Sequence, residues 1–231
     1  MVQLRWQNNM GIQRYIFKDR SDAALQLKEL LPLDRMKSEG WNLIAVSSGG
    51  LIIASEMNKR LKLPIDFIFS ASITAPQNPE CELARVSETE EIVIHQALVD
   101  AFEIQVDYIY GEATRKHEEK ILSAVYQYRK GEHFKSMKGK NILLIDEGSE
   151  TGLKLMCAIK TAFAQKAKAV YVAAPIMPSS VVEALDPIVD GIFCLQEIED
   201  YIDTGYYYHE FETVDEETIE TILERRDEIQ R

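Results

Sequence analysis

A pair of acidic residues directly after an apolar run is the part of the chain best suited to chemistry. Residues 141–145 have the composition of a buried β-strand, and Asp146 and Glu147 follow them. A turn at 148–152 then leads into a helix whose apolar periodicity begins at Leu153. The carboxylates can accept hydrogen bonds from vicinal ribose hydroxyls, and the free N–H groups of the turn and the helix start can bind a phosphate. The pattern predicts a sugar-phosphate site; the alternative is an ordinary turn with solvated acids.

A second turn, rich in glycine, follows an earlier apolar run. Residues 41–46 predict a short strand, and a helix is expected from about Leu51 to Lys62. Glycine N–H groups in such a turn are unhindered and can approach an anion closely, whereas a tight turn without a ligand is the alternative. The turn consists of Ser47, Ser48, Gly49 and Gly50.

The order of the expected elements predicts an α/β fold, because strands that alternate with helices call for a parallel sheet. The expected strands are 41–46, 65–69, 141–146, 168–174 and 191–195. The expected helices are 17–31 (ended by Pro32), 51–62, 153–165, 179–185 and 216–230, the last with Asp215 as its N-cap.

The segment between the two βαβ units reads differently. Pro76 and Pro79 predict a loop at 71–80, weak alternation predicts a short hairpin at 81–94, and residues 96–130 are expected to be mainly helical. We therefore predict one domain over residues 1–231. Its core is a doubly wound, mainly parallel sheet flanked by helices, with an inserted hairpin and helical excursion, or hood, at about 75–135 and a C-terminal tail at about 197–231.

Composition limits the classes of function. The 231 residues are 46% hydrophobic and 28% charged, which is typical of a globular protein, and the net charge of −12 argues against a general nucleic-acid surface. No apolar run is long enough to cross a membrane, and the N-terminus lacks the apolar region of a secretory signal, so a cytoplasmic location is expected. The spacing of the three cysteines, Cys81, Cys157 and Cys194, predicts neither a disulfide framework nor a direct metal site.

Five segments, in this order, carry a resemblance to a known family. They are FKDRSDAALQLKELL, IAVSSGGLIIA, APQNPE, NILLIDEGSETG and LQEIEDYIDTGYYYHEFETVDEETI. Together they resemble the type I phosphoribosyltransferases, and in particular the stand-alone bacterial branch of that family. The resemblance extends over nearly all of residues 17–225. Each motif is weak to moderate by itself, and their common order and spacing make the resemblance specific.

The resemblance implies a site for phosphoribosyl diphosphate (PRPP). Asp146 and Glu147 would hold the ribose hydroxyls, directly or through water on the Mg²⁺ that PRPP carries, so no direct protein–metal bond is expected. Residues 47–50 would form the pyrophosphate loop. Gly148, Ser149, Thr151 and Gly152 would surround the 5′-phosphate, and Glu150 and Lys154 are further residues expected to bind PRPP. The implied reaction transfers the 5-phosphoribosyl group between PRPP and a nitrogenous acceptor, for example one like a purine, with release of pyrophosphate. Relatives in the family are often dimers, so a homodimer is one expected assembly.

Departures from the family pattern concern the pyrophosphate. The family's Pro-Arg is Ser47-Ser48 here, its Arg-Lys after the second strand is Ala71-Ser72, and its usual Thr is Lys154. Each charge-assisted contact is worth about 1.5–3 kcal/mol. Either other cations replace the missing ones and the protein is an enzyme, or it is a non-catalytic, regulatory protein that binds PRPP or a nucleotide. A pure interaction protein is a third alternative. The candidate cations are Arg85, Arg115, Lys116 and Lys120, and the alternative for the last three is a solvated helix face.

Two further features leave alternatives open. Purine phosphoribosyltransferases place an Asp at the loop position of Glu150, where it accepts the proton of the base nitrogen, so Glu150 is either a general base or a solvent-facing loop acid. The aromatic residues Tyr206, Tyr207, Tyr208 and Phe211 either stack on a base or belong to a packed C-terminal segment.

Overall fold

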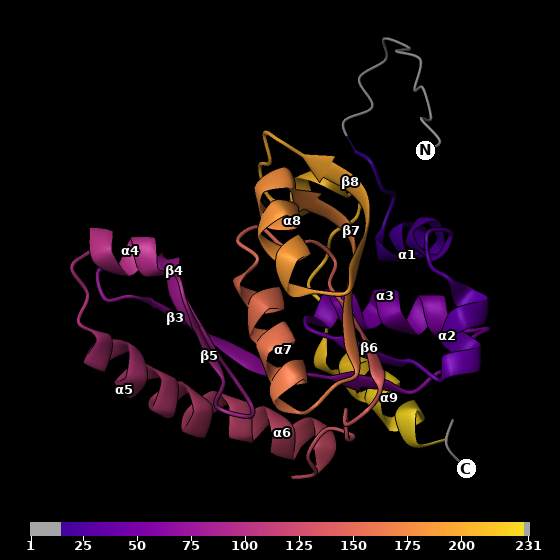
Figure 1. The fold of residues 1–231 in the computed structure, drawn as a ribbon, viewed down its shortest axis with the longest axis horizontal. Coiled ribbons are helices and arrows are strands. Elements are labelled where there is room, and N and C mark those ends of the chain that lie inside the picture. Colours follow the sequence, from indigo (N-terminus) through magenta and orange to yellow (C-terminus); the bar gives the residue numbers. More distant parts are fainter. Residues whose placement is uncertain (1–14, 229–231) are drawn as a thin grey trace.

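The computed structural model describes residues 15–228 and is organised around a five-stranded sheet (Figure 1). The order is β2-β1-β6-β7-β8, and every neighbouring pair is parallel. The N-terminal residues 1–14 and the predicted end of the last helix at Gln230 lie outside the described residues. The strands are β1 (Asn42–Ala45), β2 (Ile65–Phe67), β6 (Asn141–Ile145), β7 (Ala169–Pro178) and β8 (Gly191–Ile198). The predicted doubly wound sheet is confirmed.

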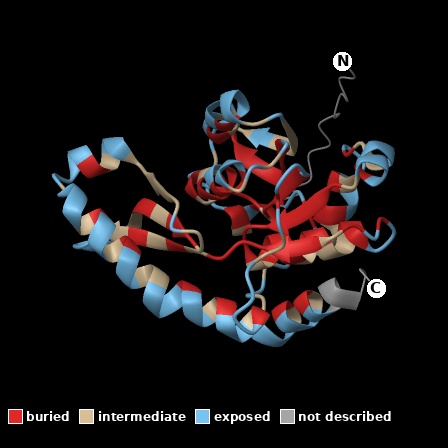
Figure 2. Cartoon of the chain, turned by 60° about the horizontal axis from the view of Figure 1, so that its bottom comes forward, coloured by how far each residue is buried: buried red, intermediate tan, exposed pale blue. Residues whose placement is uncertain are grey.

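Helices cover both faces of this sheet, because alternate strand residues point to opposite sides. Leu43 and Leu143 belong to the core under α1, α2, α3 and α9, whereas Ile44 and Leu144 belong to the core under α7 and α8. Figure 2 shows the buried strands between these layers. The helices are α1 (Arg20–Lys28), α2 (Leu33–Glu39), α3 (Ser48–Asn58), α7 (Leu153–Ala164), α8 (Ser179–Leu185) and α9 (Glu216–Glu228).

The direction of winding changes between β1 and β6. From β1 the chain passes through α3 to β2 on one side, whereas β6, β7 and β8 follow on the other side. In open α/β sheets the crevice outside the carboxyl ends of the strands at such a switch point is the usual ligand site. Ser47 and Asp146 stand just after these two strand ends.

An arm with its own sheet projects from the body (Figures 1 and 2). Three antiparallel strands, in the order β3-β4-β5, pack on an arc of helices. We call residues 70–129 the hood. It consists of β3 (Ser70–Ala75), β4 (Asn78–Ser87), β5 (Ile92–Ile94), α4 (Gln96–Ala101), α5 (Val106–Lys116), a π-helical turn η1 (His117–Ile121) and α6 (Leu122–Arg129).

The predicted loop at 71–80 is wrong, whereas the predicted hairpin and helices of this segment are confirmed. Residues 70–75 form β3 because Ala71, Ile73 and Ala75 bury one face of the strand. Pro79 is tolerated because it lies in an irregular stretch of β4, between the residues paired with Thr74 and Ala75.

Element boundaries differ near the site. The helix expected at 17–31 begins at Arg20, and α2 follows Pro32 directly. The helix expected from about Leu51 begins at Ser48, so part of the predicted turn is helical. Asp215 caps α9 as predicted, by accepting from the N–H of Thr218.

The C-terminal aromatic residues are mainly packed. Tyr207 and Tyr208 form a cluster with Phe17, and the Tyr207 carbonyl accepts the Phe17 N–H. This segment includes the short 3₁₀ helix η3 (Thr204–Tyr207); another, η2 (Asp186–Ile188), follows α8. Within residues 15–228, no helix is long and apolar enough to cross a membrane.

Candidate functional site

A short hydrogen bond joins the ends of β1 and β6. The hydroxyl of Ser47 donates to Oδ1 of Asp146 at 2.5 Å, and the Glu147 N–H donates to the same oxygen at 2.9 Å. The Ser47 hydroxyl also accepts the Gly50 N–H at 2.9 Å, which makes Ser47 the N-cap of α3. Asp146 is 0% exposed. Its carboxylate therefore holds the start of α3 against the motif strand.

The second carboxylate oxygen of Asp146 is less well satisfied. Within the described part of the chain, Oδ2 is buried without a hydrogen-bond partner, and Nζ of Lys154 lies 3.7 Å from it. A buried carboxylate needs such a neighbouring charge, because burial strongly disfavours an isolated ion. Lys154 thus reaches the acid pair, while its side chain remains 29% exposed.

Glu147 is held from the other side of the site. Nε of Arg20 lies 2.5 Å from Oε2 of Glu147, and the two side chains are only 11% and 15% exposed. Burial raises the pKa of Glu147 above its usual range, and the charge of Arg20 opposes that rise. The carboxylate covers Gly49, where an added Cβ would overlap Oε2. Only glycine fits at position 49 with Glu147 in this place.

The motif turn leaves N–H groups at the start of α7. Gly152 has a φ of +73°, which favours glycine, and it precedes α7 without a side-chain cap. Of the first-turn N–H groups, that of Leu153 has a weak contact to the Thr151 hydroxyl at 3.4 Å. The uncapped helix start is suited to an anion.

A cavity of about 360 Å³ lies over this turn, between the body, the hood and the C-terminal segment. It brings together Glu147 to Thr151 and Lys154 from the predicted site. The buried Asp146, the loop 47–50 and Gly152 do not line it. The lining residues are Glu80, Glu82, Arg85, Glu147, Gly148, Ser149, Glu150, Thr151, Lys154, Thr204 and Phe211.

A second hollow of about 350 Å³ shares Arg85 with this cavity. Arg85 donates from Nη1 to the Ser70 hydroxyl at 3.0 Å and from Nε to Glu82 at 2.8 Å. Lys120 of η1 also lines the hollow. The candidate cation Arg115 instead pairs with Glu112 and Glu119 on the exposed helix face, and Lys116 lines neither space. The hollow is lined by Phe69, Ser70, Ala71, Ser72, Arg85, Lys120, Ile121 and Ala124.

The C-terminal segment is bonded to the motif turn. Oε1 of Glu150 accepts the Thr204 N–H at 3.1 Å, so Glu150 lines the cavity and also has a partner inside the protein. Tyr208 donates from its hydroxyl to the Glu147 carbonyl at 2.7 Å. A Cβ at Gly148 would lie 2.5 Å from Thr204, so glycine permits this close approach.

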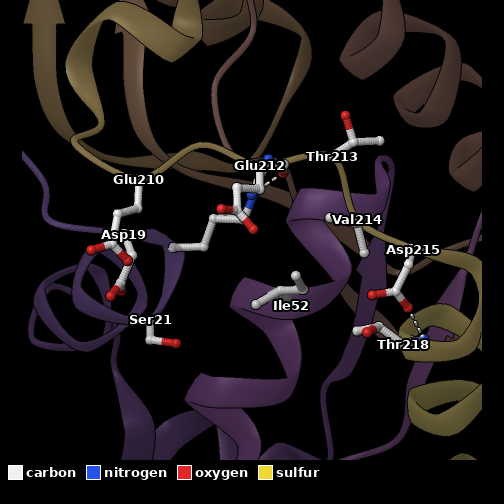
Figure 3. A pocket seen from close by; sticks show the side chains of 10 residues that line it. Asp19, Ser21, Ile52, Glu210, Glu212, Thr213, Val214, Asp215 and Thr218 are labelled. Atoms are coloured by element: carbon white, nitrogen blue, oxygen red, sulfur yellow. Dashed lines mark hydrogen bonds between the residues drawn. The ribbon is translucent and has the colours of Figure 1, made fainter.

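Arg20 and Thr204 are parts of the site that were not selected from the sequence, whereas Phe211, one of the aromatic residues considered for stacking on a base, lines the cavity. Arg20 belongs to the FKDRSDAALQLKELL segment, which was the only signal for it. Beside it lies a further hollow of about 290 Å³ (Figure 3). Figure 3 shows the side chains of Asp19 and Glu210 at one end of this hollow, Asp215 at the other and Glu212 between them, so its lining is strongly acidic.

Comparisons with known proteins agree with this fold. Two curated proteins of Mycobacterium tuberculosis (strains CDC 1551 / Oshkosh and ATCC 25618 / H37Rv), each named "Putative phosphoribosyl transferase", are 23% identical over 210 residues, or 91% of this chain. The match covers 47% of those proteins, so the chain spans about half the length of the curated relatives it matches. No family model matches the chain. The predicted resemblance to phosphoribosyltransferases is confirmed.

A solved structure shows the same architecture. The protein TT1426 from Thermus thermophilus superposes with a TM-score of 0.72 at 28% identity, over 90% of this chain and 97% of that one. A purine phosphoribosyltransferase from Pyrococcus horikoshii Ot3 aligns more loosely, with a TM-score of 0.45 and 17% identity over 88% of this chain and 100% of that one.

Proposed function

We propose that this chain, which resembles phosphoribosyltransferases in sequence and fold, binds PRPP and transfers its 5-phosphoribosyl group to a nitrogenous acceptor. The observation that carries the proposal is the cavity of about 360 Å³ at the switch point of the sheet. One carboxylate of the motif pair, the turn 148–151 and Lys154 face this single space. Its volume falls in the usual range for small-molecule sites.

The 5′-phosphate is assigned to the motif turn. The uncapped start of α7 offers backbone N–H groups and the positive end of the helix dipole. Lys154 adds a full positive charge at the same place. The ribose hydroxyls are assigned to Glu147, while Asp146 acts from beneath by fixing Ser47 and the Glu147 backbone.

The pyrophosphate is assigned to the hollow that adjoins the cavity. Arg85 and Lys120 supply two cations there, and the hydroxyls of Ser70 and Ser72 supply donors. Ser72 is directly opposite Arg85 in the β3–β4 pair, so their side chains share a face of the hood sheet. These residues would compensate for the cations that the family carries in the positions of Ser48, Ala71 and Ser72.

The charge of the cavity lining supports a divalent cation, such as Mg²⁺, that accompanies the ligand. The cavity lining has four glutamates against Arg85 and Lys154, which leaves a formal charge of two negatives. A bare polyphosphate would be repelled by this lining, whereas its Mg²⁺ complex carries less negative charge. Among the described residues, no group of three or more His, Cys, Asp or Glu could hold a metal ion. We therefore propose that Mg²⁺ binds through the phosphates of PRPP.

The transfer step assigned to this site breaks the bond between C1 of the ribose and the pyrophosphate oxygen, which leaves with the electron pair. The acceptor nitrogen forms the new bond to C1 and loses a proton, and Glu150 is the carboxylate we assign as proton acceptor, because it lines the cavity. Arg85 and Lys120 would stabilise the charge on the leaving group.

The second candidate is a non-catalytic binder of PRPP or a nucleotide. The observation in its favour is the state of the loop 47–50. Ser47 takes the Gly50 N–H, and Glu147 covers Gly49, so the loop offers no cation and little free N–H surface. Such a protein would bind the sugar phosphate without splitting it.

Calorimetry and a pyrophosphate-release assay separate these proposals. We expect PRPP to bind with Mg²⁺ and much more weakly with EDTA, and one or more nitrogenous bases in a panel to trigger pyrophosphate release. Binding without release for every base would favour the regulatory candidate. No binding of PRPP or any nucleotide, in the presence of Mg²⁺, would overturn both.

A further inference from the structure

The guanidinium of Arg20 connects three segments that are distant in the sequence. From α1, Nε lies 2.5 Å from Oε2 of Glu147, and Nη1 donates to the Glu212 carbonyl at 2.8 Å. The guanidinium carbon also lies 4.2 Å from the centre of the Phe211 ring. An arginine can make these contacts at once because its fork is planar and stacks on aromatic rings.

Two of these partners line the cavity, whereas Arg20 does not. Glu147 and Phe211 belong to the lining of the 360 Å³ cavity, whereas Arg20 belongs to the lining of the separate acidic hollow. Arg20 therefore stands behind the wall of the cavity. A ligand in the cavity would meet Glu147 and Phe211 in the positions that Arg20 gives them.

The surroundings of Glu147 explain why its position needs a cation. The groups that face it are Asp146 just after β6, Lys154 from α7, Tyr208 from the C-terminal segment and Arg20 from α1. Burial and Asp146 raise the pKa of Glu147, while Arg20 and Lys154 lower it. Without Arg20 the Glu147 carboxylate would lose both the hydrogen bond and the ion pair that the guanidinium supplies.

The C-terminal segment depends on the same residue. Thr204 is bonded to Glu150, and Tyr208 is bonded to the Glu147 backbone. The Arg20 contacts to Glu212 and Phe211 extend this attachment beyond Tyr208 and tie it to α1. One side chain thus contacts both an acid of the motif and the aromatic ring of Phe211 in the cavity lining.

We propose that Arg20 is a positioning residue that holds the Glu147 carboxylate and the Phe211 ring as one wall of the cavity. Binding of the sugar part of the ligand then depends on a residue that the ligand does not touch. Binding of phosphate at the turn 148–152 does not depend on Arg20. This inference rests on the proposed function for its ligand, but the effect on Glu147 can be measured without any ligand.

The test compares Arg20→Gln and Arg20→Lys with a matched control, Arg35→Gln. Arg35 also pairs with a glutamate, Glu39, and lies over an aromatic ring, that of Trp41, but neither of these partners lines the cavity or the adjoining hollow. We expect Arg20→Gln to weaken Mg²⁺–PRPP binding roughly tenfold or more. Inorganic phosphate should bind within about twofold of the wild type. Arg20→Lys should restore part of the loss, because it returns the charge but not the planar fork.

Carbon-13 NMR of the labelled Glu147 carboxyl gives a second readout. The side chain should titrate at higher pH in Arg20→Gln than in the wild type, because the cation that lowers its pKa is gone. An unchanged Glu147 titration would overturn the inference, and so would equal losses for PRPP and phosphate. If the wild type binds no PRPP, the proposed function fails, whereas the NMR titration still decides the role of Arg20. If Arg20→Gln does not fold, Arg20→Lys is compared with the wild type in both measurements.

Discussion

The hydroxyl of Ser47 and the buried carboxylate of Asp146 form a 2.5 Å hydrogen bond across the switch point of the sheet. This bond places the start of α3 beside the motif turn, although the two residues are 99 positions apart. Asp146 therefore has a structural task besides its position in the motif, and Glu147 is the acid of the pair that lines the cavity.

Ser47→Ala should reveal this task as a loss of stability. The variant removes the N-cap of α3 and leaves Oδ1 of Asp146 with a single donor, so we expect the free energy of unfolding to fall by about 1–2 kcal/mol. Urea denaturation measures the change. Ser48→Ala is the control, because it is the Ser47 hydroxyl that caps α3 and donates to Asp146. Equal stability of the two variants would contradict the assignment.

The acid pair gives a prediction about binding. Asp146→Asn combined with Glu147→Gln keeps both side-chain shapes and removes both charges, so PRPP or nucleotide binding should be lost while the protein stays folded. Calorimetry measures the affinity, and circular dichroism checks the fold. Glu147→Gln alone should account for most of the loss, because Asp146 does not line the cavity. An unchanged affinity in the double variant would remove the site assignment.

The cations of the hood give a third prediction. Arg85→Gln and Lys120→Gln should each weaken pyrophosphate binding roughly tenfold to a hundredfold, as expected for one charge-assisted contact. Arg115→Gln is the matched control, because its guanidinium pairs with Glu112 and Glu119 on the exposed face of the same arm. Isothermal titration with pyrophosphate compares the three. A loss of the same size in Arg115→Gln would indicate a general effect of surface charge.

Thiol reactivity tests the packing of α7 against the hood. Burial raises the pKa of the Cys157 thiol to about 12, and its Sγ contacts the carbonyls of Arg85 and Glu91. The thiol is therefore neutral at pH 8, where the reactive thiolate makes up only about one part in ten thousand. We expect iodoacetamide to label Cys157 only as the protein unfolds. Mass spectrometry of the protein treated with and without urea measures the labelling. Rapid labelling in the folded protein would show that the hood separates from α7.

Local patterns explain what could be predicted from the sequence. The strand 141–145, the turn and α7 follow from a short apolar run, two acids and a glycine, and all three elements lie where the pattern predicts them. Strand β3 was missed because its buried residues are mostly small and its neighbours include Pro76 and Pro79. Local propensity cannot show that β4 pairs with it.

The parts of the site that were missed depend on contacts that are distant in the sequence. Arg20 and Glu147 are 127 positions apart, so no spacing rule connects them. The burial of Asp146 and the cover of Glu147 over Gly49 also arise only when β1 and β6 become neighbours. The sequence predicted the types of side chain at the site, and the tertiary structure decides which of them reach the cavity.

Glu150 gives the prediction that separates catalysis from binding. Glu150→Gln keeps an acceptor oxygen for the Thr204 N–H, so the C-terminal segment should stay attached and the stability should change little. If Glu150 accepts the proton, turnover should fall by roughly 10²–10⁴-fold. PRPP affinity should hold or improve, because a negative charge near the phosphate is removed.

Steady-state kinetics and calorimetry on the same Glu150→Gln preparation make this comparison, and Thr204→Ala serves as its control. Thr204→Ala loses the weak 3.5 Å contact of its hydroxyl to Glu150 but retains the N–H bond and the carboxylate, so its turnover should fall far less than that of Glu150→Gln. Tighter PRPP binding with normal turnover in Glu150→Gln would make Glu150 a loop acid. If the wild type binds PRPP and no acceptor supports turnover, the carboxylate has no proton to accept, and the regulatory candidate accounts for the site.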